Sequence, residues 1–206
     1  EVTSDSKDIN IEGEVLEETE DKVIARDGLG IVSEINKKGD RSIPHYLDFP
    51  IKDWETWKPY KESLLDFSNR YPEDWDQIAE NYRNRDFPLG VPVGSMIGVP
   101  RNLIGFEGIA LMVHEQPDLL EDMVETFCQN TIGCIARALR DVQFDYAAGW
   151  EDICFNSGPV VGVPFYEEVI APRYRRITEL LNLHGVDIVQ TDCDGNVSPV
   201  VPAFLE

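Results

Sequence analysis

The chain has 206 residues, 42% of them hydrophobic and 10% aromatic, which suffices for a globular domain with its own core. Its 39 acidic residues against 18 basic ones give a formal net charge of −21, so nucleic acids and anionic membranes, which attract basic surfaces, are poor partners. No apolar run approaches the ~18 residues that span a bilayer, and the first residues do not begin a signal peptide, so we expect a cytoplasmic protein.

Residues 1–52 are predicted to form a β-rich segment. Short apolar runs flank the turn DGLG at 27–30, and KKGD at 37–40 makes a second turn before IPHYLDFPI at 43–51. This pattern predicts an antiparallel hairpin or a three-stranded meander. The acidic stretch at 12–21 is expected to be a solvated segment.

Residues 53–87 are predicted to form a helical connection. Asp53 is a candidate N-cap, and Pro59 interrupts the pattern that follows, so we expect only one or two short helices there. A further helix is predicted to start at Pro72, a residue suited to the first turn.

Residues 88–206 alternate between strand and helix patterns, which predicts parallel βα units. Strands are expected within 88–98, at 142–144 and at 186–189, with Gly185 ending the helix before the last strand. The helices expected between and beside them cover 102–116, 117–141 and 164–184. Apolar and small residues three and four apart predict one buried stripe on the longest helix: Leu120, Met123, Val124, Phe127, Thr131, Cys134, Ile135, Ala138 and Leu139.

The four cysteines are widely spaced and form no CxxC motif. In a chain of this size they are expected to be reduced thiols rather than a disulfide framework. Cys128 and Cys134 fall within the helical pattern and are interpreted as small core residues.

Polar residues concentrate after the predicted strands, where ligands bind in parallel α/β sheets. The segments are GSMIGVPRN (94–102), AAGWEDICFNSG (147–158) and TDCDGN (191–196). We expect them to meet at one edge. They supply nine candidate side chains: Arg101, Asn102, Glu151, Asp152, Cys154, Asn156, Asp192, Cys193 and Asp194.

Asp192 and Asp194 are the candidate metal ligands. If the strand continues through them, both project to one side and Cys193 to the other. They would then share a divalent ion or hold a cationic substrate, with oxygen ligands favouring magnesium, calcium or manganese and zinc remaining an option. The alternative is that Asp194 and Gly195 form a turn and Asp192 caps the next segment.

Three motifs, in this order, resemble the uroporphyrinogen decarboxylase (URO-D) superfamily, which includes corrinoid-linked methyltransferases. They are GSMIGVP (94–100), WED (150–152) and VPFYEEVIAPRY (163–174). The resemblance implies a TIM (β/α)8 barrel with a deep cleft at its C-terminal face. With three convincing parallel strands and a final SPVVPAFLE (198–206) that leads into a helix, we expect a partial barrel behind the N-terminal antiparallel segment.

The chain departs from both branches of that superfamily. The R-Q-A-G-R segment and the F-S-D aspartate of the decarboxylases are absent, and Phe106 stands where they place a tyrosine. Clustered carboxylates would also repel uroporphyrinogen, which carries eight. In the methyltransferases an H-x-C-G motif binds zinc, and Asp192-x-Asp194-Gly195 falls at that position, with two carboxylates in place of the imidazole and the thiolate.

These observations lead to one principal functional hypothesis. The chain is expected to be an enzyme nearer the methyltransferase branch, transferring a one-carbon group between a small substrate and a corrinoid or corrinoid protein. Glu151 and Asp152 would be general acid/base groups or would support the residues that contact the substrate, and Arg101, Asn102 and Asn156 would bind substrate. Two alternatives stay open: decarboxylation of uroporphyrinogen or a smaller substrate, and a non-catalytic binding protein.

Overall fold

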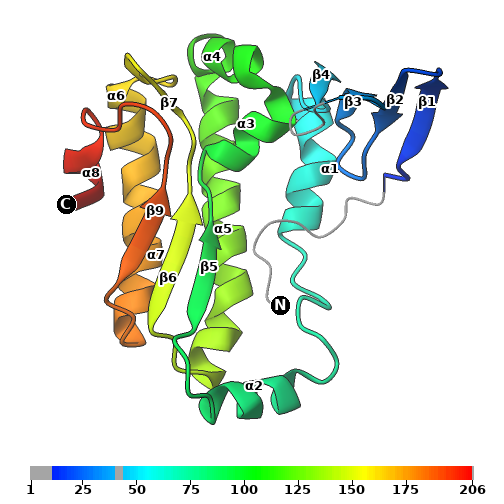
Figure 1. Cartoon of the computed structure of the whole chain (residues 1–206). Coiled ribbons are helices and arrows are strands. Elements are labelled where there is room, and N and C mark those ends of the chain that lie inside the picture. Colours follow the sequence, from blue (N-terminus) through cyan, green and yellow to red (C-terminus); the bar gives the residue numbers. More distant parts are fainter. Residues whose placement is uncertain (1–10, 40–43, 206) are drawn as a thin grey trace.

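The fold is described from a computed structural model, for residues 11–39 and 44–205. The N-terminal segment forms a four-stranded antiparallel sheet in the order β1-β2-β3-β4 (Figure 1). Its strands are β1 Glu14–Glu18, β2 Lys22–Arg26, β3 Val32–Asn36 and β4 His45–Asp48. The antiparallel prediction is confirmed, but the sheet has four strands in place of the predicted hairpin or three-stranded meander. The turn predicted at 37–40 ends outside the described residues.

Strand β1 lies in the acidic stretch that was expected to be a solvated segment. Its side chains are exposed, but Glu14 pairs with Arg26 on β2 and Glu18 with Lys37 beyond β3. Opposite charges on neighbouring strands support the pairing. The acidic segment is thus exposed, as expected, but it is also a β-strand whose glutamates pair with basic side chains.

The connecting helices are α1 Trp54–Leu64 and α2 Trp75–Arg83. Asp53 caps α1 as predicted: its carboxylate accepts from the Thr56 N–H at 2.8 Å, and the Thr56 hydroxyl accepts from the Asp53 N–H at 3.0 Å. Pro59 lies inside this single helix and does not end it. The α1 helix joins the N-terminal sheet through the Tyr60 hydroxyl, which donates to the Leu29 carbonyl at 2.8 Å.

A second sheet is parallel and three-stranded, in the order β5-β6-β9, with β5 Gly90–Gly94, β6 Tyr146–Trp150 and β9 Val189–Asp192. Strands predicted at 142–144 and 186–189 therefore begin later than expected. Val142, Phe144 and Val186 are buried, but they pack in the turns that lead into the strands. The apolar residues at these positions indicated burial correctly, but they did not indicate where the strands begin.

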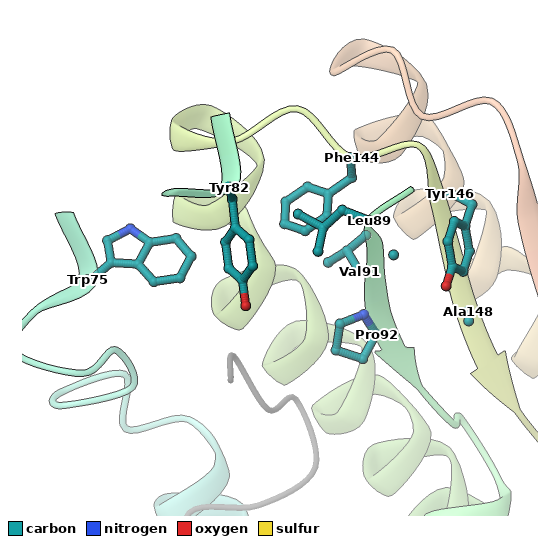
Figure 2. Close-up of a pocket in the computed structure, with 9 residues that line it drawn as sticks. Trp75, Tyr82, Leu89, Val91, Pro92, Phe144, Tyr146 and Ala148 are labelled. Carbon is teal, nitrogen blue, oxygen red and sulfur yellow. The ribbon is translucent and has the colours of Figure 1, made fainter. Parts of the chain in front are cut away.

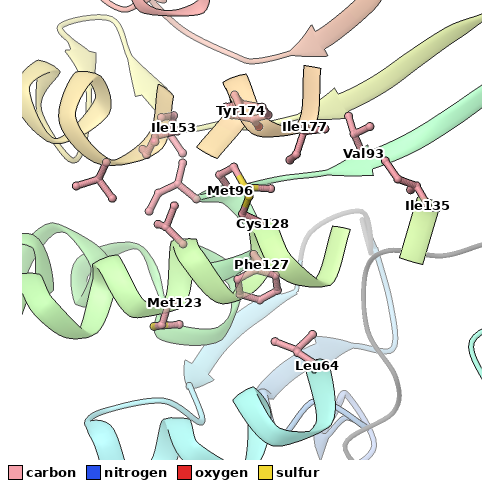
Figure 3. Packing of buried hydrophobic residues seen from close by; sticks show 14 of the residues in the cluster. Leu64, Val93, Met96, Met123, Phe127, Cys128, Ile135, Ile153, Tyr174 and Ile177 are labelled. Atoms are coloured by element: carbon pink, nitrogen blue, oxygen red, sulfur yellow. The ribbon is translucent and has the colours of Figure 1, made fainter. Parts of the chain in front are cut away.

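Helices α5 (Pro117–Asp141) and α7 (Ala171–Leu183) pack together on one face of this sheet (Figure 1). The α5 helix has the predicted bounds, and every member of its predicted stripe is buried. Figure 3 shows part of the core, to which Met123, Phe127 and Ile135 of α5, Val93 of β5 and Ile177 of α7 contribute. The remaining elements are α3 Gly98–Ile104, α4 Phe106–Glu115, α5 Pro117–Asp141, β7 Cys154–Phe155, β8 Gly158–Pro159, α6 Val163–Phe165, the π-helix Tyr166–Ile170, α7 Ala171–Leu183 and α8 Val201–Leu205.

The expected TIM barrel, whole or partial, is wrong for this structure. The described residues place three parallel strands in an open sheet, with the four antiparallel strands in a separate one. A (β/α)8 barrel needs eight parallel strands closed on themselves. The alternating pattern after residue 88 identified parallel βα units correctly, but such units also build open sheets. Within the described ranges, no helix is both long and apolar enough to cross a membrane.

Candidate functional site

Glu151, the residue after β6, contacts both of the other segments that were expected to meet, since its N–H donates to the Asp192 carbonyl at 2.8 Å and its carboxylate binds the loop after β5. Its side chain is fully buried and accepts five hydrogen bonds. The backbone N–H groups of residues 96–98 donate at 2.8, 3.1 and 3.0 Å, and the Ser95 hydroxyl donates at 2.9 Å. The Tyr174 hydroxyl of α7 is the fifth donor. One carboxylate thus fixes the loop after β5, the end of β6 and helix α7.

The protonation of Glu151 reflects two opposing influences. Burial raises the pKa of Glu151, because an anion loses its hydration, while the hydrogen bonds from Tyr174, Met96 and Ser95 act in the opposite direction. Since the side chain is enclosed, it does not face a ligand. Glu151 therefore positions the loop 95–98.

Asp152, the next residue, has a strained backbone. Its φ is 43°, and among the described residues only Asn69 is another non-glycine with positive φ. Two contacts hold Asp152: Arg101 donates to its carbonyl oxygen, and the Asp194 N–H donates to its Oδ1 at 3.1 Å. Strain of this kind concentrates at functional sites, where surrounding contacts maintain it.

Arg101 lies at the centre of the polar edge. Its guanidinium donates to Asn102 Oδ1 at 3.1 Å and lies 5.8 Å from the centre of the Trp150 ring, within cation–π range. Arg101, Asp152 and Asp194 are therefore brought together as predicted. Asn156 is exposed in the turn between β7 and β8.

Zinc, which the superfamily resemblance implied, does not fit the residues present. Asp192 and Asp194 are both exposed, and Cys193 instead packs against the core. Over residues 11–39 and 44–205, no three His, Cys, Asp or Glu side chains are grouped closely enough to hold a metal ion. A structural or catalytic zinc needs at least three protein ligands.

Two cavities adjoin this edge. One of about 390 Å³ lies between α7, β9 and α8 and is lined by Tyr174, Arg175, Thr191 and Cys193. The other, of about 380 Å³, is bounded by Arg101 together with residues of the N-terminal sheet. Both volumes are in the range of small-molecule sites.

A third cavity, of about 320 Å³, lies along the first halves of β5 and β6 (Figure 2). Trp75, Tyr82, Phe144 and Tyr146 line it, and the lining holds no carboxylate, cation or thiol. This cavity is away from the carboxyl ends of the strands. Arg101, Asp152 and Asp194 lie at the other end of the sheet.

Ser95 and Tyr174 were not predicted from the sequence to be members of the site. Ser95 and Tyr174 lie inside the motifs 94–100 and 163–174, so the signal was present at the level of the motif. What the sequence did not reveal is that both hydroxyls converge on Glu151.

Comparison of the chain with protein-family models, with curated proteins and with solved structures finds no match.

Proposed function

We propose that this protein is an enzyme that transfers a one-carbon group to or from a small polar substrate at the carboxyl edge of the β5-β6-β9 sheet. The observation that carries the proposal is the strained backbone of Asp152 beside Arg101 and Asp194. The order of the motifs at 94–100, 150–152 and 163–174 is similar to that of the URO-D superfamily, and Asp192-x-Asp194-Gly195 falls where its methyltransferase branch has H-x-C-G.

Asp152 is the acid/base group in this proposal. Its Oδ1 is occupied by the Asp194 N–H, and its side chain is only partly buried, so Oδ2 is left to exchange a proton with the substrate. A carboxylate that removes a proton from a thiol or hydroxyl makes that atom a better acceptor of a methyl group. Arg101 would orient an anionic group of the substrate.

Glu151 has a positioning role in this proposal. It fixes the loop from which α3 begins, and α3 carries Arg101. The two cavities at this edge, about 390 and 380 Å³, suit a small substrate. A corrinoid macrocycle is larger than either, so the corrinoid would belong to a partner protein.

The decisive variant is Asp152→Asn. Asparagine keeps the Oδ1 acceptor and tolerates positive φ, so the fold should persist while proton transfer is lost. With methylcob(III)alamin and a panel of small thiols, loss of the methyl–cobalt absorbance reports transfer. We expect a rate roughly 10²- to 10⁴-fold below wild type.

Asp187→Asn is the matched control, because Asp187 is exposed in the turn before β9, and it should transfer methyl groups at the wild-type rate. Equal rates in Asp152→Asn and wild type would refute the assigned role. Carbon dioxide release from uroporphyrinogen in place of methyl transfer would favour the decarboxylase. Ligand binding without turnover would favour a binding protein.

A further inference from the structure

Two cysteines that are far apart in the sequence lie on neighbouring segments at the candidate site, and both are free. The Cys193 thiol donates to the Asp194 carbonyl at 3.5 Å, and burial together with the nearby Cys193 raises the pKa of Cys154 to about 12. The backbones that carry them are also in contact, since the Asn196 N–H donates to the Phe155 carbonyl at 2.8 Å. A Cβ added to Gly195 would lie 2.2 Å from the Cys154 carbonyl oxygen. Glycine at 195 therefore permits this close approach.

A buried hydroxyl accompanies the two thiols. Tyr166 is fully buried, and its hydroxyl has no hydrogen-bond partner among the described residues. The groups that act on it electrostatically are Glu151, Cys193 and Cys154. An unpaired buried hydroxyl costs free energy, so its retention calls for an explanation. Because burial raises the pKa of Tyr166, this hydroxyl keeps its proton and is available as a donor.

We propose that Cys154 and Cys193 are a modification site, where a low-molecular-weight disulfide converts the two thiols into a reversible disulfide and the Tyr166 hydroxyl stabilises the charged sulfur during exchange. This goes beyond the proposed methyl transfer and does not depend on it. The site has the two features that exchange requires, which are an accessible first thiol and a second thiol on the neighbouring segment.

The first thiol is Cys193, because it is partly exposed and lines the cavity of about 390 Å³, whereas Cys154 is only 8% exposed. Cys193 attacks one sulfur of the small disulfide, and one small thiol leaves with the Cys193 proton. Cys154 then attacks the Cys193 sulfur of the mixed disulfide, and the second small thiol leaves with the Cys154 proton. The protein loses two electrons and two protons, and the small disulfide gains them.

Oxidation would fix one side of the candidate site. Cys154 begins β7, two residues after Asp152, and Cys193 precedes Asp194. The disulfide would therefore bridge the two segments that the Asp194–Asp152 hydrogen bond already joins.

The test is oxidation of the full native chain with glutathione disulfide, followed by alkylation of remaining thiols, digestion and mass spectrometry. We expect two of the four thiols to disappear, one peptide pair joined through Cys154 and Cys193, and full reversal by dithiothreitol. Cys128 and Cys134 are fully buried and serve as internal controls that stay alkylatable only after unfolding.

Three variants make the experiment specific. Cys154→Ser should stop at a stable mixed disulfide on Cys193, and Cys193→Ser should not react. Tyr166→Phe keeps the ring against Phe204 and removes only the hydroxyl, so cross-linking should be roughly tenfold slower, equivalent to one hydrogen bond to a charged atom. The proposal fails if wild type forms no Cys154–Cys193 bond or links Cys128 or Cys134 instead. An unchanged rate in Tyr166→Phe would remove the role of Tyr166.

Discussion

Glu151 shows how much one side chain can organise in this protein. Sequence reasoning selected it as a candidate acid/base group because it follows a strand beside Asp152. The structure gives it five donors and no exposed surface. Residue type and position could be predicted, but burial could not, because the groups that enclose Glu151 come from residues 95–98 and from Tyr174.

The variant Glu151→Gln tests this positioning role. The glutamine amide would present N–H groups to donors that need acceptors, leaving buried groups unpaired. We expect a loss of about 3 kcal/mol in the free energy of unfolding, measured by urea denaturation. Glu168→Gln changes an exposed side chain of the π-helix and should leave the midpoint unchanged. Equal midpoints for the two variants would contradict the role given to Glu151.

At the scale of elements, Gly105 decides where α3 ends and α4 begins. Residues 102–116 were predicted to be one helix, but Gly105 has φ 85° and splits it. The Phe49 ring lies against this position, and a Cβ there would be 2.4 Å from its Cε2 atom. A local apolar pattern continues across the break, so periodicity alone did not detect it.

Gly105→Ala should therefore destabilise the protein by about 2 kcal/mol, because alanine is strained at this φ and clashes with the ring. Gly28→Ala is the control, since Gly28 has no positive φ and a Cβ there would meet only the Ile11 carbonyl oxygen, at 3.8 Å. Thermal unfolding of both variants measures the difference. A melting temperature for Gly105→Ala at or above that of Gly28→Ala would contradict the argument.

Helices α5 and α7 are joined by ion pairs at Glu125, which offer a pH-dependent test. Burial opposes ionisation there, but hydrogen bonds from Arg176, Gln129 and Arg173 outweigh it and lower the pKa of Glu125 below 4.5. A carboxylate with a depressed pKa contributes stability above its unfolded pKa, and that contribution is lost as the pH falls through the folded value.

Glu125→Gln should accordingly cost about 1 kcal/mol near neutral pH, since the pair is partly exposed. The difference from wild type should shrink below about pH 4.5. Urea denaturation at a series of pH values measures it, with the exposed Glu179→Gln on α7 as control. A difference that grows on acidification would reverse the sign argued here.

For the whole molecule, the net charge of −21 is the dominant long-range property. Like charges repel one another most in the compact state, and salt screens that repulsion over about 8 Å at physiological ionic strength. The melting temperature should therefore rise from low salt to about 0.2 M sodium chloride and then level off. An unchanged or falling melting temperature over this range would show that specific ion pairs outweigh the general repulsion.

The sequence by itself determined the elements whose pattern is local. Periodicity and capping within short windows predict four features: the bounds and buried stripe of α5, the Asp53 cap, the antiparallel N-terminal segment and the parallel βα units. The meeting of Arg101, Asp152 and Asp194 followed from one further rule, that parallel strands end at a common edge.

Only the tertiary structure decided the number and closure of the parallel strands, the burial of Glu151, and the pairing of the segments that carry Cys154 and Cys193. Each depends on contacts between segments distant in the chain. Such contacts depend on how whole helices and strands pack together, and the local sequence pattern does not encode that packing.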